Sequence, residues 1–243
     1  MTRQIFFDTE TTGLELKEGH RIVEIGAIEV IDKVATGNFF HCYLNPEGKA
    51  TEPETEAITH IRDDFLLDKP LFKEVWPEFK AFLSGADQLV AHNAEFDISF
   101  LDAEIRRINP KSKPLAKQFE IVDSLVLARH KFPGQRNSLD ALCKRYKIDL
   151  TQRQEEGHGA LLDAKLLFMV YSALTLGEQE LMDLDAPEKV ITTALEAAPS
   201  VVDSDGAVLE PHEIKAHQDF LRMMLEKASN KSIVWQDYEN FDQ

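Results

Sequence analysis

The stretch that decides the fold is residues 4–13, which read Gln-Ile-Phe-Phe-Asp-Thr-Glu-Thr-Thr-Gly. Residues 4–8 have the apolar character of a short buried strand. Asp8 and Glu10 come at its end, and side chains two positions apart on an extended chain point to the same side. Paired carboxylates repel each other unless a divalent cation neutralises them. The stretch therefore indicates a strand that ends in a cation site, although taken alone it fits a solvated turn equally well.

Outward from this stretch, the hydrophobic pattern predicts strands first and then strands alternating with helices. Further strands are expected over residues 21–32 (with an interruption at Gly26), 39–44 and 88–92. Helices are expected over residues 73–83, 95–107, 124–130, 138–146 and 159–174. The short connections between the first three strands favour a meander, and the order of elements favours an α/β domain with a mixed sheet.

The composition of the chain changes near residue 176. The whole chain of 243 residues has a net charge of −16, and residues 176–243 alone hold 15 acidic and 5 basic side chains. Residues 183–210 have the acidic, aromatic-poor composition of a linker without a core. Apolar side chains then return at helical spacing from Ile214 onward. We expect one domain over residues 1–175 and, over 176–243, a flexible acidic linker with a partner-binding C-terminal segment.

Composition also excludes several classes of protein. No apolar run reaches 18 residues, so no membrane span is expected, and the first residues lack a secretory signal. Cys42 and Cys143 are isolated, which excludes a zinc motif and a disulfide framework and favours reduced thiols in the cytoplasm. The acidic balance argues against a free-standing, tight nucleic-acid binder, because such proteins are usually basic.

A second motif, residues 92–97, reads His-Asn-Ala-Glu-Phe-Asp. It lies where a predicted strand passes into a helix, the usual place for ligand groups in open α/β sheets. Asp97 is placed there to add a third carboxylate. Asn93 fits a helix cap, and Phe96 fits either the core or a stacking surface.

A third motif, residues 158–163, reads His-Gly-Ala-Leu-Leu-Asp. Asp163 falls in the first turns of the helix expected over residues 159–174, and His158 precedes it in a loop flanked by glycines. A lone histidine is more often structural than catalytic. Here, however, it comes five residues before an aspartate in a chain with two other acidic motifs. A neutral imidazole near pH 7 can take a proton from an attacking water.

In this order the three motifs resemble the DEDD exonuclease superfamily in its histidine branch, which reads Asp-x-Glu, Asn-x-x-Phe-Asp and His-x-Ala-x-x-Asp. The resemblance implies a ribonuclease-H-like fold, a mixed five-stranded sheet flanked by helices. It narrows to the proofreading epsilon subunits of bacterial DNA polymerase III through residues 21–27, 63–66, 123–125, 132–142 and 158–171, and it covers residues 3–175. One departure is Thr59-His60-Ile61, where those subunits commonly have His-Gly-Ile; the resemblance assigns no role to His60.

The resemblance implies a 3′→5′ exonuclease that removes mispaired nucleotides from a single-stranded or frayed 3′ DNA end by two-metal phosphodiester hydrolysis. Two Mg²⁺ or Mn²⁺ ions would be held by Asp8, Glu10, Asp97 and Asp163. His158 would act as general base on the attacking water. The terminal nucleotide would contact Thr11, Thr12, Gly13, Ile61 and Phe96.

The same resemblance implies partners for residues 176–243. Residues 179–184 resemble a peptide that binds the sliding clamp, through Gln179, Met182 and Leu184, and a plain linker is an equally open interpretation. The catalytic (alpha) polymerase subunit would be bound by Phe220, Leu221, Leu225 and Trp235. A small theta-like accessory subunit is a further candidate partner. The expected location is the cytoplasm, at the bacterial nucleoid and replisome, with no membrane attachment.

Two other functions compete with this interpretation. One is an RNA-trimming member of the superfamily, such as ribonuclease T or oligoribonuclease, but those chains usually end soon after the third motif. A contact to the ribose 2′-OH would distinguish the two. The other is a non-catalytic polymerase scaffold, which the loss of a metal ligand or of the histidine would favour; all five of these residues are present.

Overall fold

The structure, a computed structural model, describes residues 1–175, except the side chains of residues 154–156. The acidic linker and the partner-binding segment predicted over residues 176–243 lie outside the described residues, as do the residues named above for clamp and polymerase binding.

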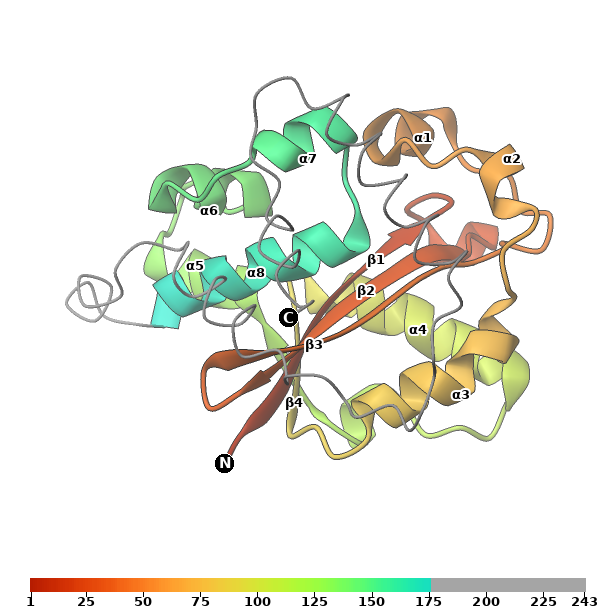
Figure 1. The fold of residues 1–243 in the computed structure, drawn as a ribbon, viewed down its shortest axis with the longest axis horizontal. Helices are drawn as coiled ribbons and strands as arrows, with labels where there is room; N and C mark the ends of the chain where they lie inside the picture. Colours follow the sequence, from red (N-terminus) through yellow and green to blue (C-terminus); the bar gives the residue numbers. More distant parts are fainter. Residues whose placement is uncertain (176–243) are drawn as a thin grey trace, which may run out of the picture. The chain divides into compact units, whose positions relative to one another are not determined.

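A five-stranded mixed sheet forms the centre of the described part (Figure 1), and its strands follow the order β3-β2-β1-β4-β5. Its strands are β1 (Arg3–Thr11), β2 (Ile22–Ile31), β3 (Val34–Tyr43), β4 (Gln88–Ala91) and β5 (Glu120–Asp123). The first three form an antiparallel meander, and β4 and β5 run parallel to β1. The predicted fold class and meander are confirmed.

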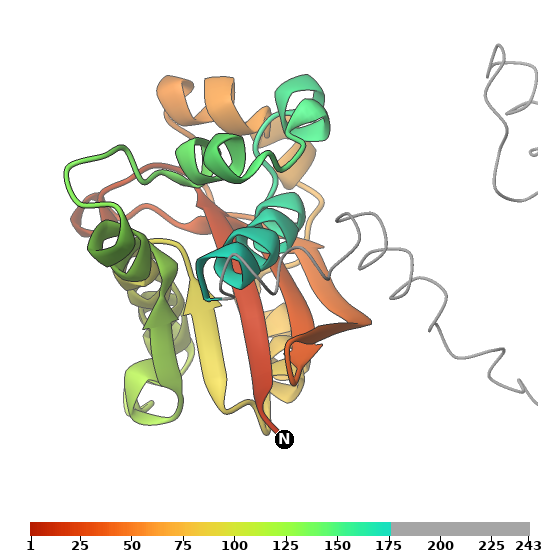
Figure 2. The ribbon, with the colours of Figure 1, turned by 90° about the vertical axis from the view of Figure 1, so that its left-hand side faces the viewer.

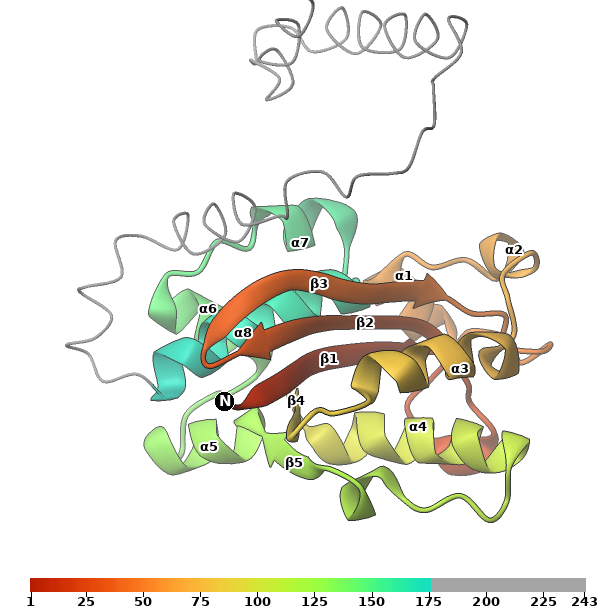
Figure 3. The ribbon, with the colours of Figure 1, turned by 60° about the horizontal axis from the view of Figure 1, so that its bottom comes forward.

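Helices cover both faces of the sheet (Figures 2 and 3). One face packs against α3 (Phe72–Leu83) and α4 (Ala94–Ile108). The other packs against α5 (Ser124–Lys131), α6 (Leu139–Tyr146) and α8 (Ala160–Thr175). Short helices lie beyond the end of β1 (Figure 1): α1 (Pro53–Thr59), α2 (Asp63–Leu66) and α7 (Thr151–Glu156). Single 3₁₀ turns occupy Leu16–Glu18 and Leu115–Lys117.

The central strand β1 is buried on both faces, which explains its unbroken apolar run. Ile5 and Phe7 belong to the core on the α3–α4 side, and Phe6 belongs to the core on the α8 side. There the Phe6 ring meets Phe168 and Tyr171 edge-on, with ring centroids 5.3 and 5.2 Å apart. Because side chains alternate along a strand, Asp8 and Glu10 share the face of Phe6 that α8 covers.

β3 begins at Val34 and not at residue 39 as predicted, and three further details differ from the sequence prediction. First, β1 does not end at Asp8: it stays paired with β2 as far as Thr11, with Glu10 opposite Glu24. Second, β2 continues through Gly26 without interruption. A Cβ at Gly26 would lie 2.0 Å from the Leu161 backbone nitrogen, so this glycine lets the start of α8 approach the sheet. Third, α1, α2, α7 and β5 were not expected from residue patterns, because they are short and three of them are strongly polar.

Candidate active site

The end of β1 holds Asp8 and Glu10, both half-buried. β4 pairs with β1 only from Gln4 to Phe6, so the remainder of β1 has a free edge on the β4 side. The start of α4 closes this edge. The Thr9 amide and hydroxyl donate to Asp97 Oδ1 at 3.0 and 2.7 Å. Asp97, which is buried, is thereby fixed next to the two carboxylates of β1.

The first turn of α8 brings Asp163 to the same place from the opposite layer. Asp163 is buried, and the close approach of α8 at Gly26 sets its height above the sheet. Its two oxygens accept from one arginine: Arg153 Nε donates to Oδ1 and Arg153 Nη2 to Oδ2, each at 2.7 Å. Arg153 lies in a short polar segment, residues 151–156, and no sequence motif predicts a role for it in the site.

The three sequence motifs therefore meet in one acidic cluster, made of Asp8, Glu10, Asp97 and Asp163. Burial raises the pKa of Asp8, and the charges of Asp97, Glu10 and Asp163 raise it further. Burial followed by the charges of Asp163 and Glu24 raises the pKa of Glu10. Burial raises the pKa of Asp97 to about 7, although its hydrogen bonds from Thr9 oppose the shift. Arg153 opposes the shifts of Asp8 and Glu10 without cancelling them.

His158 lies beside this cluster in the loop between α7 and α8. Its backbone N–H donates to the Ile58 carbonyl at 3.1 Å, which ties the loop to α1. Its Nδ1 lies 3.1 Å from Arg153 Nη2 and 4.0 Å from Asp163 Oδ2. The side chain is 37% exposed, so solvent reaches it. Burial and the nearby Arg153 charge lower the pKa of His158, which keeps the ring neutral near pH 7.

Glu24 is an acidic residue of the site that sequence reasoning missed. It is buried in β2 opposite Glu10, and its Oε1 lies 2.7 Å from His41 Nε2. Its Oε2 is buried and has no hydrogen-bond partner. The apolar run of residues 22–31 contains two acidic residues, Glu24 and Glu29, and the residue pattern alone does not show which of them belongs to the site.

The donor set of the cluster fits hard divalent cations. Such ions prefer carboxylate oxygens, and here several carboxylates are buried together against only partial compensation by a cation. Ligand atoms of Glu10, His158 and Asp163 all lie within 4.8 Å of one another. The unpartnered oxygen of Glu24 adds to the negative potential. A bound cation would relieve the repulsion among Asp8, Glu10, Asp97 and Asp163 that raises the pKa values of Asp8 and Glu10.

The residues expected to contact a nucleotide lie around this cluster, largely buried. Thr11 and Thr12 use their hydroxyls internally: Thr11 Oγ1 donates to the Gly13 carbonyl, and Thr12 Oγ1 lies 2.9 Å from His20 Nδ1. The space left by the missing side chain of Gly13 is filled by the His20 ring, which a Cβ there would meet at 2.4 Å. The missing Cβ of Gly13 therefore leaves room for the His20 ring. Ile61 is buried against Val23 and Leu66.

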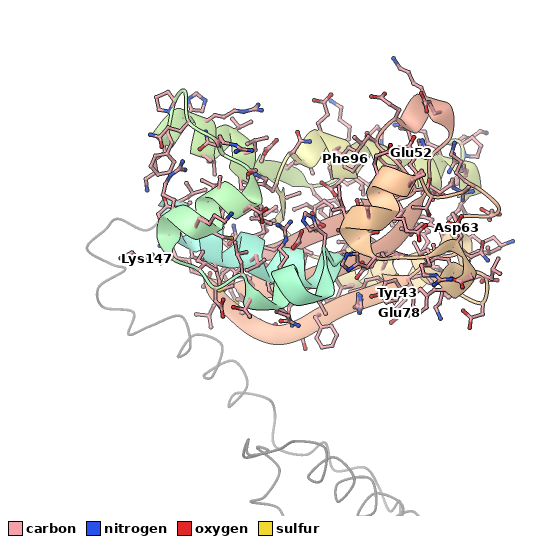
Figure 4. All side chains as sticks on the ribbon, turned by 90° about the horizontal axis from the view of Figure 1, so that it is seen from above. Tyr43, Glu52, Asp63, Glu78, Phe96 and Lys147 are labelled. Atoms are coloured by element: carbon pink, nitrogen blue, oxygen red, sulfur yellow. The ribbon has the colours of Figure 1, made fainter. Side chains whose placement is uncertain are left out.

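Phe96 and Asn93 lie at the start of α4, and Figure 4 shows Phe96 from above this end of the domain. Phe96 packs on the α3–α4 core, and its ring centroid is 4.8 Å from that of Phe100. Asn93 occupies the cap position with a left-handed backbone, φ 70°, but its side chain does not cap the helix. The capping carboxylate is Asp123, which accepts from the Asn93 and Ala94 amides, each at 3.1 Å.

This geometry defines a class of protein: a ribonuclease-H-like α/β domain with an Asp-x-Glu strand, two further aspartates on helices and a histidine on a loop. Comparison with known proteins gives the family. The sequence model described as "RNase_T: Exonuclease" matches residues 5–171. The chain therefore belongs to this exonuclease family.

Two relatives with the same name, from different bacteria, illustrate the likeness. DNA polymerase III subunit epsilon of Rickettsia prowazekii (strain Madrid E) is 43% identical over 229 residues, 93% of this chain and 98% of that protein. The subunit of the same name from Escherichia coli (strain K12) is 51% identical over 185 residues, 73% of each chain. These relatives favour a proofreading exonuclease over the RNA-trimming and scaffold alternatives.

Solved structures agree on the fold. Exonuclease X in complex with 5′ overhanging duplex DNA has a TM-score of 0.50 and 30% identity, over 75% of this chain and 98% of that one. The zinc-bound complex of E. coli exonuclease I with single-stranded DNA has a TM-score of 0.62 at 16% identity, over 75% of this chain and 42% of that one. The second likeness concerns the fold alone.

None of the helices in the described part of the chain has the length and apolar character that crossing a bilayer requires.

Proposed function

We propose that this chain is the 3′→5′ proofreading exonuclease subunit of a bacterial replicative DNA polymerase and that it releases nucleoside 5′-monophosphates from mispaired 3′ ends of DNA. One observation carries the proposal: the carboxylates of Asp8, Glu10, Asp97 and Asp163 converge beside His158 at the end of β1. The relatives named DNA polymerase III subunit epsilon support the assignment to a polymerase.

The four carboxylates would hold two Mg²⁺ or Mn²⁺ ions, which when bound lower the pKa of the attacking water and stabilise charge on the leaving 3′-oxygen. The protein's own contribution is positioning. Thr9 fixes Asp97 with two hydrogen bonds, and the contact at Gly26 fixes the α8 turn that carries Asp163. The site is thus assembled before the substrate arrives, which avoids a reorganisation cost during the reaction.

His158 would act as the general base by accepting a proton from the attacking water at a ring nitrogen. The lowered pKa of His158 keeps that nitrogen available at neutral pH. Its loop is tied to α1 through the Ile58 carbonyl, and the side chain is open to solvent on one side. A nucleotide bound at the acidic cluster, beside the loop that follows α7, would therefore meet this ring; α1 and α7 are neighbours in Figure 1.

The terminal nucleotide would be shaped by Thr11, Thr12, Gly13, Ile61 and Phe96. Because the threonine hydroxyls are engaged internally, Thr11, Thr12 and Gly13 would present backbone atoms, and His20 would hold their loop from behind. Ile61 and Phe96 would present apolar edges to the base. Such a pocket takes an unpaired end, and a mispaired terminus costs less to unstack than a paired one.

Residues 1–175 would form the exonuclease domain and residues 176–243 a tether to partners. Gln179, Met182 and Leu184 would bind the sliding clamp. The polymerase alpha subunit would be bound by Phe220, Leu221, Leu225 and Trp235. Tethering raises the effective concentration at the primer end and so replaces the DNA affinity that an acidic domain lacks. A small theta-like subunit would be a further partner of this complex. As part of a polymerase, the chain would work in the cytoplasm, at the replisome.

The activity is tested by digesting 3′-labelled single-stranded DNA and RNA of the same sequence, with Mg²⁺, Mn²⁺ or a chelator. The proposal predicts metal-dependent release of 5′-monophosphates from DNA, faster than from RNA, and no release by Asp163→Asn. Equal or faster digestion of RNA would favour an RNA-trimming enzyme. Full activity of folded Asp163→Asn protein would contradict the proposed site.

The tether is tested by a pull-down of the full chain with the polymerase subunit. Leu221→Asp combined with Trp235→Ala should abolish retention. The matched control is Leu67→Asp, at a position in the domain that is 75% exposed. Unchanged retention of the double variant, or equal loss in the control, would move the contact to the catalytic domain.

A further inference from the structure

Arg153 is a buried cation inside the acidic cluster. Its side chain, on α7, is 8% exposed. Its guanidinium covers both oxygens of Asp163 at 2.7 Å, a two-pronged, charge-assisted pairing that is among the stronger hydrogen-bond arrangements in proteins. A further nitrogen, Nη1, contacts the half-exposed carboxylate of Asp140 on α6.

The Arg153 guanidinium occupies the two oxygens of Asp163, a residue proposed above as a metal ligand. The guanidinium engages Asp163, and its charge acts on Asp8 and Glu10 as well. A cation of charge two bound by Asp163 would face this positive charge at close range, where the repulsion is large because the site is shielded from water. The guanidinium and a bound cation therefore compete for Asp163.

The Arg153 side chain has space into which it could move away from Asp163. A cavity of about 170 Å³ adjoins the guanidinium and is lined by Asp140, Lys144, Leu150, Arg153 and His158. Asp140 already accepts from Nη1, so the guanidinium keeps a charged partner when it leaves Asp163. Only the side chain has to move.

We infer that Arg153 is a resident counter-cation that holds the site together without metal, competes with divalent cations for Asp163 and is released from it when they bind. This inference rests on the metal site of the proposed function. It gives Arg153 a positioning role, since its contacts are to Asp163, Asp140 and His158.

The release would also act on His158. An arginine N–H can only donate, so in the contact with Arg153 Nη2 the His158 Nδ1 serves as an acceptor. Departure of the guanidinium would break this contact as well as the pairing with Asp163.

The test is calorimetric titration of Mn²⁺ into the metal-free full-length protein, together with its melting temperature in a chelator. Arg153→Gln should tighten Mn²⁺ binding by about tenfold or more, since a competing charge is removed, and should lower the metal-free melting temperature. Arg153→Lys, which keeps the charge but loses the two-pronged pairing, should fold and tighten binding less.

The matched control is Arg21→Gln. Arg21 makes the same kind of pairing with buried Glu104, from Nε to Oε1 at 2.5 Å and from Nη2 to Oε2 at 2.9 Å. Its loss should lower the melting temperature and leave the Mn²⁺ affinity unchanged, as any purely structural ion pair would.

Unchanged or weaker Mn²⁺ binding by Arg153→Gln, with wild type binding normally, would overturn the counter-cation role. If Arg153→Gln fails to fold, Mn²⁺ binding by Arg153→Lys no tighter than wild type does the same. Absence of saturable Mn²⁺ binding by wild type would instead overturn the proposed metal site, so the two failures are distinguishable.

Discussion

Two buried acidic regions lie toward opposite ends of the β1–β2 pair, and they differ in how their charge is compensated. Near the start of β1, Glu29 accepts from Arg3 Nε at 2.6 Å, from the Thr36 hydroxyl at 2.7 Å and from the Asn38 amide at 2.8 Å. Burial alone would raise the pKa of Glu29, but these hydrogen bonds outweigh it, and the pKa is lowered. This carboxylate is stable as an anion without any ligand.

At the end of β1, burial outweighs the compensating hydrogen bonds and charges. Asp8, Glu10 and Asp97 keep raised pKa values although Arg153 and Thr9 offset part of the burial. A carboxylate that only supports a fold is supplied with partners by the fold, as Glu29 is. The carboxylates at the other end lack sufficient partners, and this shortage is what makes them candidates for cation binding.

The largest expected effect comes from removing one charge at the end of β1. Asp97→Asn keeps an oxygen for both Thr9 hydrogen bonds but loses the negative charge. We expect kcat to fall by more than about 10³-fold, because several kcal/mol of transition-state stabilisation depends on bound metal. Single-turnover digestion of labelled DNA measures it.

The control for that variant is Glu29→Gln at the compensated end. It should lower the melting temperature and leave kcat near that of wild type. The contrast between the two regions fails if Asp97→Asn digests DNA at a wild-type rate or if Glu29→Gln loses activity to the same extent.

The next effect concerns His158. His158→Gln should reduce kcat by about 10²–10⁴-fold, the usual contribution of a general base, while Mn²⁺ affinity stays within a few-fold of wild type. Some activity should return at raised pH, where hydroxide is more abundant. Because the pKa of His158 is lowered, the acid limb of the wild-type pH–rate profile should fall below the ordinary histidine value of 6.5. Superimposable profiles for wild type and variant would remove His158 from the mechanism.

A substitution at Gly26 tests whether close packing fixes the start of α8 against the sheet. A methyl group at this position would collide with the start of α8, so Gly26→Ala should cost about 1–3 kcal/mol of unfolding free energy and displace Asp163. Gly159→Ala adds the same methyl where the nearest atom, Glu24 Oε1, is 3.8 Å away. Urea unfolding of both variants measures the difference, and equal stabilities would show that the contact at Gly26 does not fix the helix.

The smallest expected effect is a gain of stability at His60, which ends α1 next to Gly157. Its backbone is left-handed, φ 58°, which disfavours any residue with a Cβ. His60→Gly should stabilise the fold by up to about 1 kcal/mol. Lys147→Gly relieves the same backbone conformation, φ 58°, at the end of α6. Loss of stability in His60→Gly alone would show that the imidazole contact with the Gly157 region matters more than backbone strain.

The fold could be predicted from the sequence where side chains decide it. Residues 5–7 and 22–31 are buried by their own apolar patterns, and the long helices α3, α4 and α8 repeat apolar residues at helical spacing. The short helices α1, α2 and α7 could not be predicted in this way, because their polar segments are held by contacts with distant parts of the chain. His60 illustrates this: its left-handed backbone, not its side-chain type, ends α1.

The site was predictable in part. Asp8, Glu10, Asp97, Asp163 and His158 stand in motifs with fixed spacing, and the structure brings them together. Their roles, and those of the nucleotide-pocket residues, stay predictions. Arg153 and Asp123 could not be anticipated, because a single charged residue in a polar segment gives no sign of what it will meet in space. The residues predicted to bind clamp and polymerase lie outside the described part of the chain.

The central claim, that the end of β1 holds carboxylates in need of a cation, is tested most directly by the unfolding free energy of metal-free protein between pH 6.5 and 8. The folded-state pKa of Asp97 is about 7 against an ordinary 3.8, so the folded protein binds a proton that the unfolded chain has released. The stabilisation that comes from protonated Asp97 is therefore complete below pH 3.8, and it is lost as the pH rises through 7. His92 and His158, whose pKa values are lowered in the folded protein, add a rise of stability near pH 6.5 that opposes this decline, so the comparison with Asp97→Asn isolates the contribution of the carboxyl group.

Urea unfolding in a chelator should accordingly give a lower free energy at pH 8 than at pH 6.5, and saturating Mn²⁺ should remove or reverse that decline. Asp97→Asn, which has no carboxyl to titrate there, should show a weaker pH dependence in the chelator. A metal-free wild type whose stability is flat or rises between pH 6.5 and 8, with no stabilisation by Mn²⁺, would contradict the claim.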